Sequence, residues 1–207
     1  MRNDANPDKP SDHGQILLWC TSDNGHEGVV KLLLAHNDVD PDKSSNNGET
    51  PVWVAAYSGY QGVAKLLLTM NDVNPDKPNN KDETLLWGAS YSGYEEVVKL
   101  LLIRNDVNPD KPRNDGGTPL WVASYSGYEG VVKMLLAWNN VNSDKPSDNS
   151  RTLPWAASYS GHEGVVKLLL AWYNINPDKP RNDGGTPGWG GASYSGYEEV
   201  VKLLLSS

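Results

Sequence analysis

The sequence has few of the residues that mark secreted or nucleic-acid-binding proteins. Cys20 is the only cysteine among 207 residues, so the chain has no internal disulfide, which favours a reducing compartment over secretion. Its 18 lysines and arginines are outnumbered by 26 aspartates and glutamates. A net charge of -8 argues against a nucleic acid or an anionic membrane surface as partner, because both attract basic patches.

Long apolar segments are also missing. The longest aliphatic runs, such as "VVKLLLA", are far too short to cross a bilayer. The start, "MRNDANPDKPSDHG", lacks the apolar stretch of a signal peptide. Together these absences predict a soluble, cytoplasmic protein that binds neither membrane nor nucleic acid.

What the sequence contains instead is one motif at constant spacing. "NPDKP" or a close variant begins at six positions, each 34 residues after the previous one: Asn6, Asp40, Asn74, Asn108, Asn142 and Asn176. A fixed period of this length is typical of stacked arrays, in which each repeat buries its apolar face only against its neighbours. We expect a single domain over residues 1–207 with six repeats, at 6–39, 40–73, 74–107, 108–141, 142–175 and 176–207. Residues 1–5 match the tail of a preceding repeat, and the last repeat stops at "VVKLLLSS", so both ends look cut from a longer array or fused to something else.

Each repeat carries the signals of two helices joined by a tight turn. Thr118 suits an N-cap and Pro119 the first helical position, and "LWVASYS" then runs to the turn at Gly127. The second helix, "YEGVVKMLLAW", places valines and leucines at helical spacing, with Glu129 near its positive end. The linking segments are rich in Pro, Asn, Asp and Gly and predict loops or hairpins. The expected fold class is all-α, with almost no strand.

The end of the second helix has no glycine, and asparagine is predicted to take the left-handed C-cap position there. These asparagines are Asn37, Asn71, Asn105 and Asn139.

The repeats resemble the ankyrin family. "TPLW", the turn glycine, the "VV" and "LL" pairs and "DVN" follow the family pattern T-P-L-H-x-A, G-H, V-V, L-L and D-V-N in all six copies. The resemblance covers almost the whole chain and implies an ankyrin-repeat solenoid. The acidic "VNPDKP" style is also similar to ankyrin arrays of fungal NACHT-type signalling NTPases, which implies the sensor region of a larger receptor.

Tryptophan stands where the family usually has histidine. This tryptophan column comprises Trp19, Trp53, Trp87, Trp121, Trp155 and Trp189. Recurring once per repeat beside the first-helix cap, it is predicted to pack between adjacent repeats, with the indole N–H reaching a loop carbonyl. A binding role for these rings is the alternative.

A tyrosine column ends the first helix of each repeat except the first: Tyr57, Tyr91, Tyr125, Tyr159 and Tyr194. In ankyrin proteins these positions face the concave groove, as do the loop tips and the ends of the second helices. The resemblance therefore predicts further partner-binding residues at the tips (Glu49, Lys81, Glu83 and Arg151) and at the helix ends (Met70, Arg104, Trp138 and Trp172). Large aromatics interleaved with adaptable polar groups are typical of recognition surfaces. The alternative is that the tyrosines only pack against one another as a ladder.

Catalysis has little support in the sequence. Cys20, His26 and Asp23 lie close together, but His26 occupies the turn position where the family often has histidine. No phosphate loop, paired-carboxylate site or metal-ligand spacing is present, so we expect no enzyme activity, no cofactor and no metal.

The expected function is recognition of a protein partner on the tyrosine-lined concave face. The alternative is a structural spacer, or a module that associates weakly end to end through repeats without polar caps; otherwise the chain is expected to be a monomer. The close likeness of the copies would also fit a designed array, although the irregular first and last repeats argue against it.

Overall fold

The structure, a computed structural model, describes residues 6–138, 141–148, 151–172, 175–176, 192–193 and 195–206. The chain divides into two compact units, the N-terminal unit of residues 1–107 and the C-terminal unit of residues 108–207. The division falls between two of the expected repeats.

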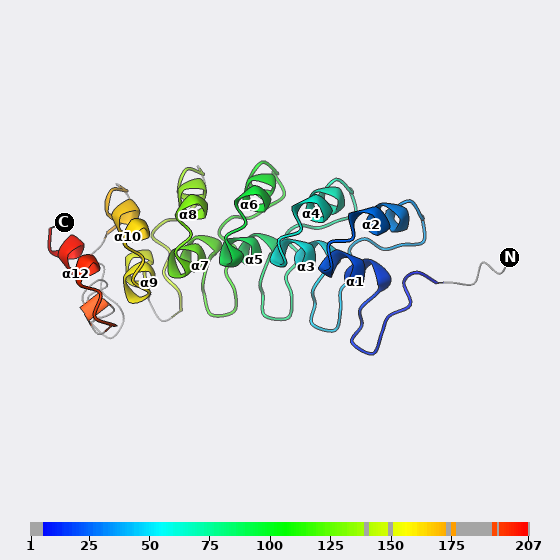
Figure 1. Cartoon of the computed structure of the whole chain (residues 1–207), viewed down its shortest axis with the longest axis horizontal. Coiled ribbons are helices and arrows are strands. Elements are labelled where there is room, and N and C mark those ends of the chain that lie inside the picture. Colours follow the sequence, from blue (N-terminus) through cyan, green and yellow to red (C-terminus); the bar gives the residue numbers. More distant parts are fainter. Residues whose placement is uncertain are drawn as a thin grey trace. The chain divides into compact units, whose positions relative to one another are not determined.

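Helices account for all the regular structure in the described part of the chain, which confirms the all-α prediction (Figure 1). The N-terminal unit contains α1 (Leu17–Asp23), α2 (Glu27–Leu34), α3 (Pro51–Tyr57), α4 (Gln61–Leu68), α5 (Leu85–Ser92) and α6 (Glu95–Leu102). The C-terminal unit contains α7 (Pro119–Ser126), α8 (Glu129–Leu136), α9 (Leu153–Tyr159), α10 (Glu163–Leu170) and α12 (Glu198–Leu205).

Within each unit the helices stack as antiparallel pairs. In the N-terminal unit the first helices α1, α3 and α5 pack side by side, and the second helices α2, α4 and α6 form a row beside them (Figure 1). In the C-terminal unit α7 packs on α9, and α10 packs on both α8 and α12. Each pair buries its apolar face only against its neighbours, as expected for a repeat array.

The threonine before α3, α5, α7 and α9 is an N-cap, as predicted. Its side-chain oxygen accepts a hydrogen bond from the tryptophan amide three residues on, at 3.2 Å for Thr50 and Trp53. The same bond forms at Thr84, Thr118 and Thr152. The exception is α1, where Ile16 stands at the cap and gives no side-chain bond. Since an N-cap contributes about 1 kcal/mol, α1 starts with less local support than the other first helices.

Glycine closes the turn between the two helices of each pair. Gly93 and Gly127 are left-handed C-caps, with φ of 75° and 82°. The prediction that asparagine plays this part after the second helix is wrong for Asn37, Asn71 and Asn105, because Asp82 is the only described non-glycine residue with a positive φ; Asn139 lies outside the described residues. The second helices end instead in right-handed caps followed by a further turn, in which the amide of Val39 bonds to the carbonyl of His36 at 3.3 Å. That extra turn satisfies the helix end without a left-handed residue.

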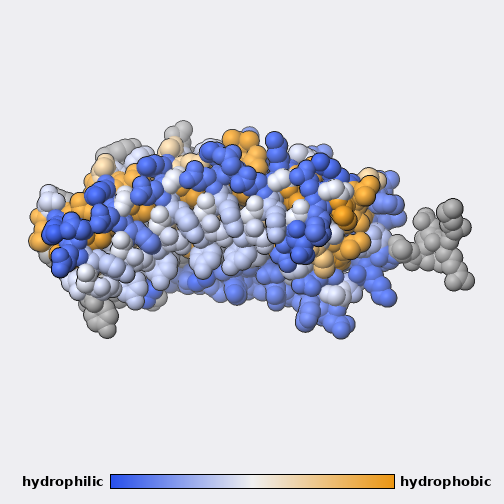
Figure 2. All heavy atoms as spheres, in the orientation of Figure 1, coloured by the Kyte–Doolittle hydropathy of each residue, from blue (hydrophilic) through white to orange (hydrophobic). Residues whose placement is uncertain are grey.

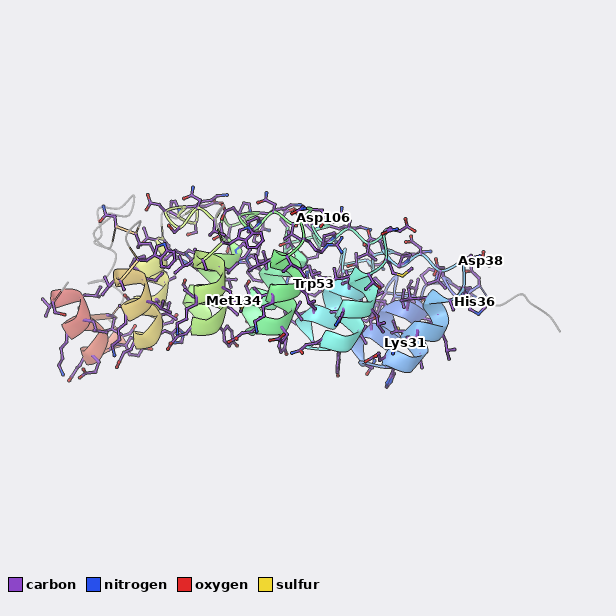
Figure 3. The ribbon with its side chains drawn as sticks, turned by 90° about the horizontal axis from the view of Figure 1, so that it is seen from above. Lys31, His36, Asp38, Trp53, Asp106 and Met134 are labelled. Carbon is purple, nitrogen blue, oxygen red and sulfur yellow. The ribbon has the colours of Figure 1, made fainter. Side chains whose placement is uncertain are left out.

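The core is aliphatic and lies between the two rows of helices. Leu86 on α5 and Val97 and Leu101 on α6 are fully buried, and Leu120 and Leu135 fill the same places in the C-terminal unit. Each such side chain contributes about 1.5 to 3 kcal/mol by leaving water. The second helices turn their lysines outward, as Lys31 shows on α2 (Figure 3).

The tryptophan column belongs to this core. Trp19, Trp53, Trp87 and Trp155 are buried and Trp121 is half-buried, while Trp189 lies outside the described residues. The Trp53 indole donates to the Glu83 carbonyl at 3.2 Å, and that of Trp121 to the Arg151 carbonyl at 2.9 Å. The burial of the described tryptophans fits the predicted packing, and the predicted bond to a loop carbonyl forms at Trp53 and Trp121, but the buried indole N–H of Trp19 has no partner among the described residues.

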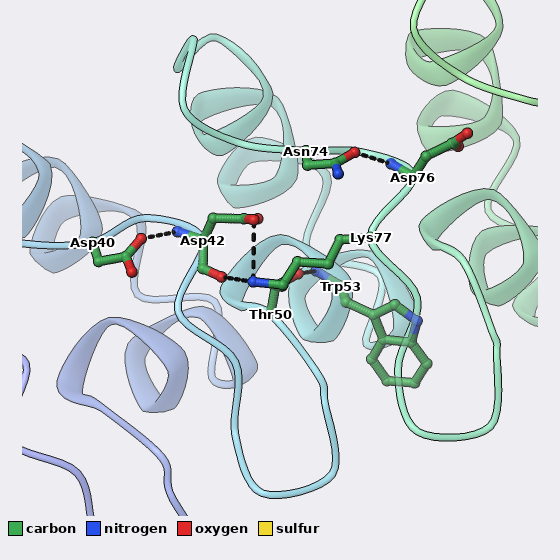
Figure 4. A network of polar contacts seen from close by, with 7 residues as sticks. All are labelled: Asp40, Asp42, Thr50, Trp53, Asn74, Asp76 and Lys77. Carbon is green, nitrogen blue, oxygen red and sulfur yellow. Dashed lines mark hydrogen bonds and ion pairs between the residues drawn. The ribbon is translucent and has the colours of Figure 1, made fainter.

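The "PDKP" loops link neighbouring repeats through polar groups (Figure 4). The first residue of the five motifs from Asn6 to Asn142 caps its own loop, as where Asp40 accepts from the Asp42 amide at 2.9 Å. The lysine then reaches back one repeat: Lys77 pairs with the Asp42 carboxylate at 3.2 Å and also donates to its carbonyl. Burial raises the pKa of Asp42 above its ordinary value, and the charge of Lys77 opposes that shift. The loops are thus tied to one another from repeat to repeat.

Candidate protein-binding face

The tyrosine column occupies the last turn of the first helices. Tyr57 and Tyr91 end α3 and α5 in the N-terminal unit, and Tyr125 and Tyr159 end α7 and α9 in the C-terminal unit. Their exposed fractions are 40, 43, 37 and 40%. Tyr194 lies outside the described residues. The four described tyrosines therefore present a comparable share of each ring to solvent.

Each tyrosine stacks on the tryptophan one helical turn before it. The ring centroids lie 4.9 Å apart for Trp53 and Tyr57, and 5.5 Å apart for Trp87 and Tyr91, with nearly parallel planes. The C-terminal unit repeats this at 5.4 and 4.7 Å. Tyr57 and Tyr91 are also parallel to each other at 6.3 Å. Tyrosine therefore packs on tyrosine, as in the alternative ladder, for the pair Tyr57 and Tyr91, and all four rings remain about two-fifths exposed.

The first member of the column is an aspartate. Asp23 ends α1, 34 residues before Tyr57, and is half-buried. Its carboxylate accepts a hydrogen bond from the Ser58 hydroxyl at 3.2 Å, which joins α1 to the end of α3. Sequence reasoning assigned Asp23 no place in the column, although the 34-residue period puts it there.

The four predicted loop-tip residues sit in different surroundings. Glu49 is half-buried, and burial raises the pKa of its carboxyl above the ordinary value, with the charge of Asp23 adding to the shift. Lys81 is exposed, whereas Glu83 is buried and accepts from the Asn79 amide group at 2.8 Å. Arg151 is half-buried, with its guanidinium carbon 4.8 Å from the centre of the Trp155 ring.

The predicted helix-end residues Met70, Arg104, Trp138 and Trp172 are all half-buried. Arg104 donates two hydrogen bonds to the Asp106 carboxylate, at 2.8 and 2.6 Å, and one to the Leu68 carbonyl at 2.6 Å. The guanidinium holds the pKa of Asp106 below its ordinary value. Arg104 is therefore already committed to contacts within the N-terminal unit.

A second row of rings escaped the sequence reasoning. Tyr60 and Tyr94 stand at the N-terminal ends of α4 and α6, each against the turn glycine of the preceding repeat. A Cβ on Gly59 would come within 2.6 Å of the Tyr94 ring. In the C-terminal unit His162 takes this place against Gly127 and bonds through Nε2 to the Tyr125 carbonyl at 3.0 Å. The recurring "SGY" and "SGH" triplets are the signal that could have predicted this row.

In the described ranges of the chain, no three His, Cys, Asp or Glu side chains gather closely enough to hold a metal ion. Cys20 is a half-buried free thiol. None of the helices given above has the length and apolar character needed to span a membrane.

Comparison with known proteins gives the family. A family model described as ankyrin repeats in three copies matches residues 1–79 and 70–145, so the chain belongs to the ankyrin-repeat family. Ankyrin repeats generally mediate protein–protein interaction and are typically not enzymes. A search of curated proteins finds no match.

Two solved structures show how far the fold likeness extends. An ankyrin repeat protein is similar with a TM-score of 0.81 and 23% identity, over 92% of this chain and 96% of that one. An ankyrin repeat domain from Acinetobacter baumannii is similar with a TM-score of 0.78 and 25% identity, over 91 and 96% of the two chains. These likenesses confirm the ankyrin-repeat fold. They do not support the narrower resemblance to fungal NTPase arrays, which stays a sequence-based prediction.

Proposed function

We propose that the chain is a non-catalytic protein-binding module whose binding face is the tyrosine column. The observation that carries this proposal is that Tyr57, Tyr91, Tyr125 and Tyr159 are about two-fifths exposed although each ring is already stacked on a tryptophan. A ring held in place before binding loses little rotamer freedom on binding, so its contact area is converted efficiently into affinity.

The residues around the column suit the same role. Ser58 and Ser92 follow Tyr57 and Tyr91, and their hydroxyls donate within the unit, to the Asp23 carboxylate and to the Tyr57 carbonyl, which joins the ends of neighbouring first helices. In the C-terminal unit, Trp138 and Trp172 at the ends of α8 and α10 add partly exposed aromatic surface. Tyrosine and tryptophan are enriched among the residues that dominate binding energies.

The proposal is tested by comparing the proteins that immobilised variants retain from a cell extract. The test variant replaces Tyr57, Tyr91, Tyr125 and Tyr159 with alanine. The matched control replaces Tyr60, Tyr94 and Tyr128, which are comparably accessible tyrosines beside the second helices. We expect the test variant to lose the retained protein and the control to keep it, with circular dichroism showing both folded. Loss in the control alone would move the binding face to the second row.

Self-association through the α1–α2 end is a second candidate, favoured by a specific observation. Leu17, Val29 and Leu32 are 51, 41 and 71% exposed, and Figure 2 shows an apolar patch over these helices. The counterparts of Val29 in later repeats, Val63 and Val97, are 2 and 0% exposed because a preceding helix covers them. A rise of sedimentation coefficient with concentration that Leu32→Lys abolishes would support this candidate; a constant monomer value would exclude it.

The setting of the module is also part of the proposal. The sequence style favours a place as the sensor region of a larger signalling NTPase, and the single cysteine favours the cytoplasm. Sequencing the full coding region around this chain tests the first point, since an NTPase domain in the same protein is required.

A further inference from the structure

One loop-tip position differs in charge between the two units. The residue just before the capping threonine is Glu49 and Glu83 in the N-terminal unit, and Gly117 and Arg151 in the C-terminal unit. The difference extends to the whole units. Residues 1–107 carry 9 basic and 16 acidic side chains, a formal charge of -7, whereas residues 108–207 carry 9 and 10, a charge of -1. Nearly all the excess negative charge therefore lies in the N-terminal unit.

In the C-terminal unit, a cationic side chain of the chain itself lies against the stacked aromatic rings. The Arg151 guanidinium lies over the Trp155 ring, which in turn stacks on Tyr159. A cation over an aromatic face is stabilised by about 0.5 to 2 kcal/mol, depending on how far it is desolvated. This contact shows where a guanidinium can lie relative to a Trp–Tyr pair in this fold.

The N-terminal unit has the same aromatic pair but carboxylates around it. Asp23 is joined through Ser58 to the helix end that carries Tyr57, and Glu49 precedes the helix that carries both Trp53 and Tyr57. Among the described residues, neither carboxylate has a salt-bridge partner within 4 Å.

The electrostatics of these groups are mutually unfavourable. Burial raises the pKa of Glu49 and the charge of Asp23 adds to the shift, while hydrogen bonds from the Ser45 and Asn47 side chains and the charge of Lys81 offset it only in part. Burial, and after it the nearby rings and the charges of Glu83 and Glu49, raise the pKa of the Tyr57 phenol. An added positive charge would lower both pKa values, because it favours the ionised form of the carboxyl and of the phenol.

We propose that the N-terminal end of the tyrosine column binds an arginine or lysine side chain of a protein partner, between the Tyr57 ring and the carboxylates of Asp23 and Glu49. The inference rests on the proposed function, since it names the chemistry of the partner at that face. The apolar stem of the side chain lies along the exposed part of Tyr57, and its charged end meets the two carboxylates. The net charge of -7 in this unit steers a basic segment toward the face and makes the association rate depend on salt.

The test uses a displayed library of short random peptides selected on the full chain. Each selected peptide is resynthesised with citrulline in place of arginine and norleucine in place of lysine, which removes the charge but keeps the stem. Binding is measured to the chain, to the variant Asp23→Asn/Glu49→Gln, and to the control Glu27→Gln/Glu95→Gln, which removes two charges from the second helices. Tyr57→Ala/Tyr91→Ala is measured in parallel.

We expect basic residues to be enriched in the selected peptides. Affinity should fall about tenfold when the peptide loses its charge, and by a similar factor with Asp23→Asn/Glu49→Gln, but change less than about twofold with the control. Raising the salt concentration should weaken binding to the chain more than to Asp23→Asn/Glu49→Gln.

Two failures are distinguishable. Peptides that lose affinity with Tyr57→Ala/Tyr91→Ala but not with Asp23→Asn/Glu49→Gln would overturn the cation inference and leave the proposed function standing. Peptides that tolerate both variants, or a selection without any binder, would count against the tyrosine column as a binding face and therefore against both proposals.

Discussion

Trp53 and Tyr57 in the N-terminal unit and Trp155 and Tyr159 in the C-terminal unit stack at nearly the same distance, 4.9 and 4.7 Å. Threonine caps the helix before both pairs, and a loop-tip residue precedes each cap. Yet that residue is an acid in one unit and an arginine in the other. The buried framework, which is the threonine cap and the stacked tryptophan and tyrosine, is thus the same in both units, whereas the charge of the loop-tip residue differs. The same fold can therefore carry a negative or a positive side chain beside the stacked rings.

The largest expected effect tests whether the stacked tryptophans contribute equally to the free energy of unfolding in the two units. Trp87→Ala and Trp155→Ala should each lower the free energy of unfolding by about 3 to 5 kcal/mol, because each removes a buried aromatic and the ring stacked on it loses its support. Urea unfolding followed by circular dichroism measures both. A loss below about 1 kcal/mol in one unit would show that the two stacks are not equivalent.

The turn glycines offer the next comparison. Gly59→Ala and Gly127→Ala should each cost about 2 kcal/mol, because both glycines have positive φ and a Cβ would meet the ring of Tyr94 or His162. Gly28 on α2 is the control, since its Cβ would meet nothing within 4 Å. Gly28→Ala should instead raise the free energy of unfolding by roughly 0.5 kcal/mol. Equal tolerance of all three changes would contradict the close packing at the turns.

Moving the charge from one unit to the other sharpens the contrast. Glu49→Arg should place a guanidinium beside Trp53, as Arg151 lies over Trp155. The new arginine would then occupy the place proposed for the cation of the partner. Peptides selected for basic side chains should then bind at least about tenfold more weakly, through like-charge repulsion and occlusion. Thermal unfolding should show little loss of stability. Unchanged peptide affinity would place the basic contact elsewhere.

The smallest effect concerns pH. The pKa of Glu49 is raised in the folded chain, so the ionised carboxylate disfavours folding above that raised pKa, and the penalty disappears as the pH falls below the ordinary value of 4.5. Glu49→Gln should therefore shift the urea midpoint slightly upward at neutral pH and not at all near pH 4. Asp115, whose pKa Arg113 lowers, is the opposite case in the C-terminal unit. Asp115→Asn should lower the midpoint at neutral pH; that loss should begin to shrink as the pH falls to 3.8 and should vanish only once the pH has fallen through the lowered pKa of the folded chain.

The sequence predicts most of the framework because the repeats are local and regular. Thr84, Trp87 and Gly93 carry the cap, the core ring and the turn within ten residues, so spacing alone places them. The left-handed conformation was predicted wrongly for Asn37, Asn71 and Asn105, because the further turn after their helices depends on backbone hydrogen bonds that the residue types do not indicate.

The binding face was less predictable. Tyr57 and Tyr91 follow from the period, but the burial of Glu83 and the pairing of Arg104 with Asp106 depend on side-chain conformations that spacing does not fix. Asp23 was missed because it differs in type from the tyrosines it aligns with. A residue that differs in type from its counterparts in the other repeats can therefore belong to the same face as they do.

The loop contacts have a consequence for how such chains change over generations. Lys43, Lys77 and Lys145 each reach a carbonyl 35 residues earlier, and Asn46 and Asn80 each reach one 34 residues earlier. Each bond joins a repeat only to the one before it. When a whole 34-residue segment is duplicated or deleted, the two repeats that meet at the new junction therefore carry equivalent donors and acceptors. The gene can therefore lengthen or shorten in single steps while every remaining donor keeps an equivalent acceptor.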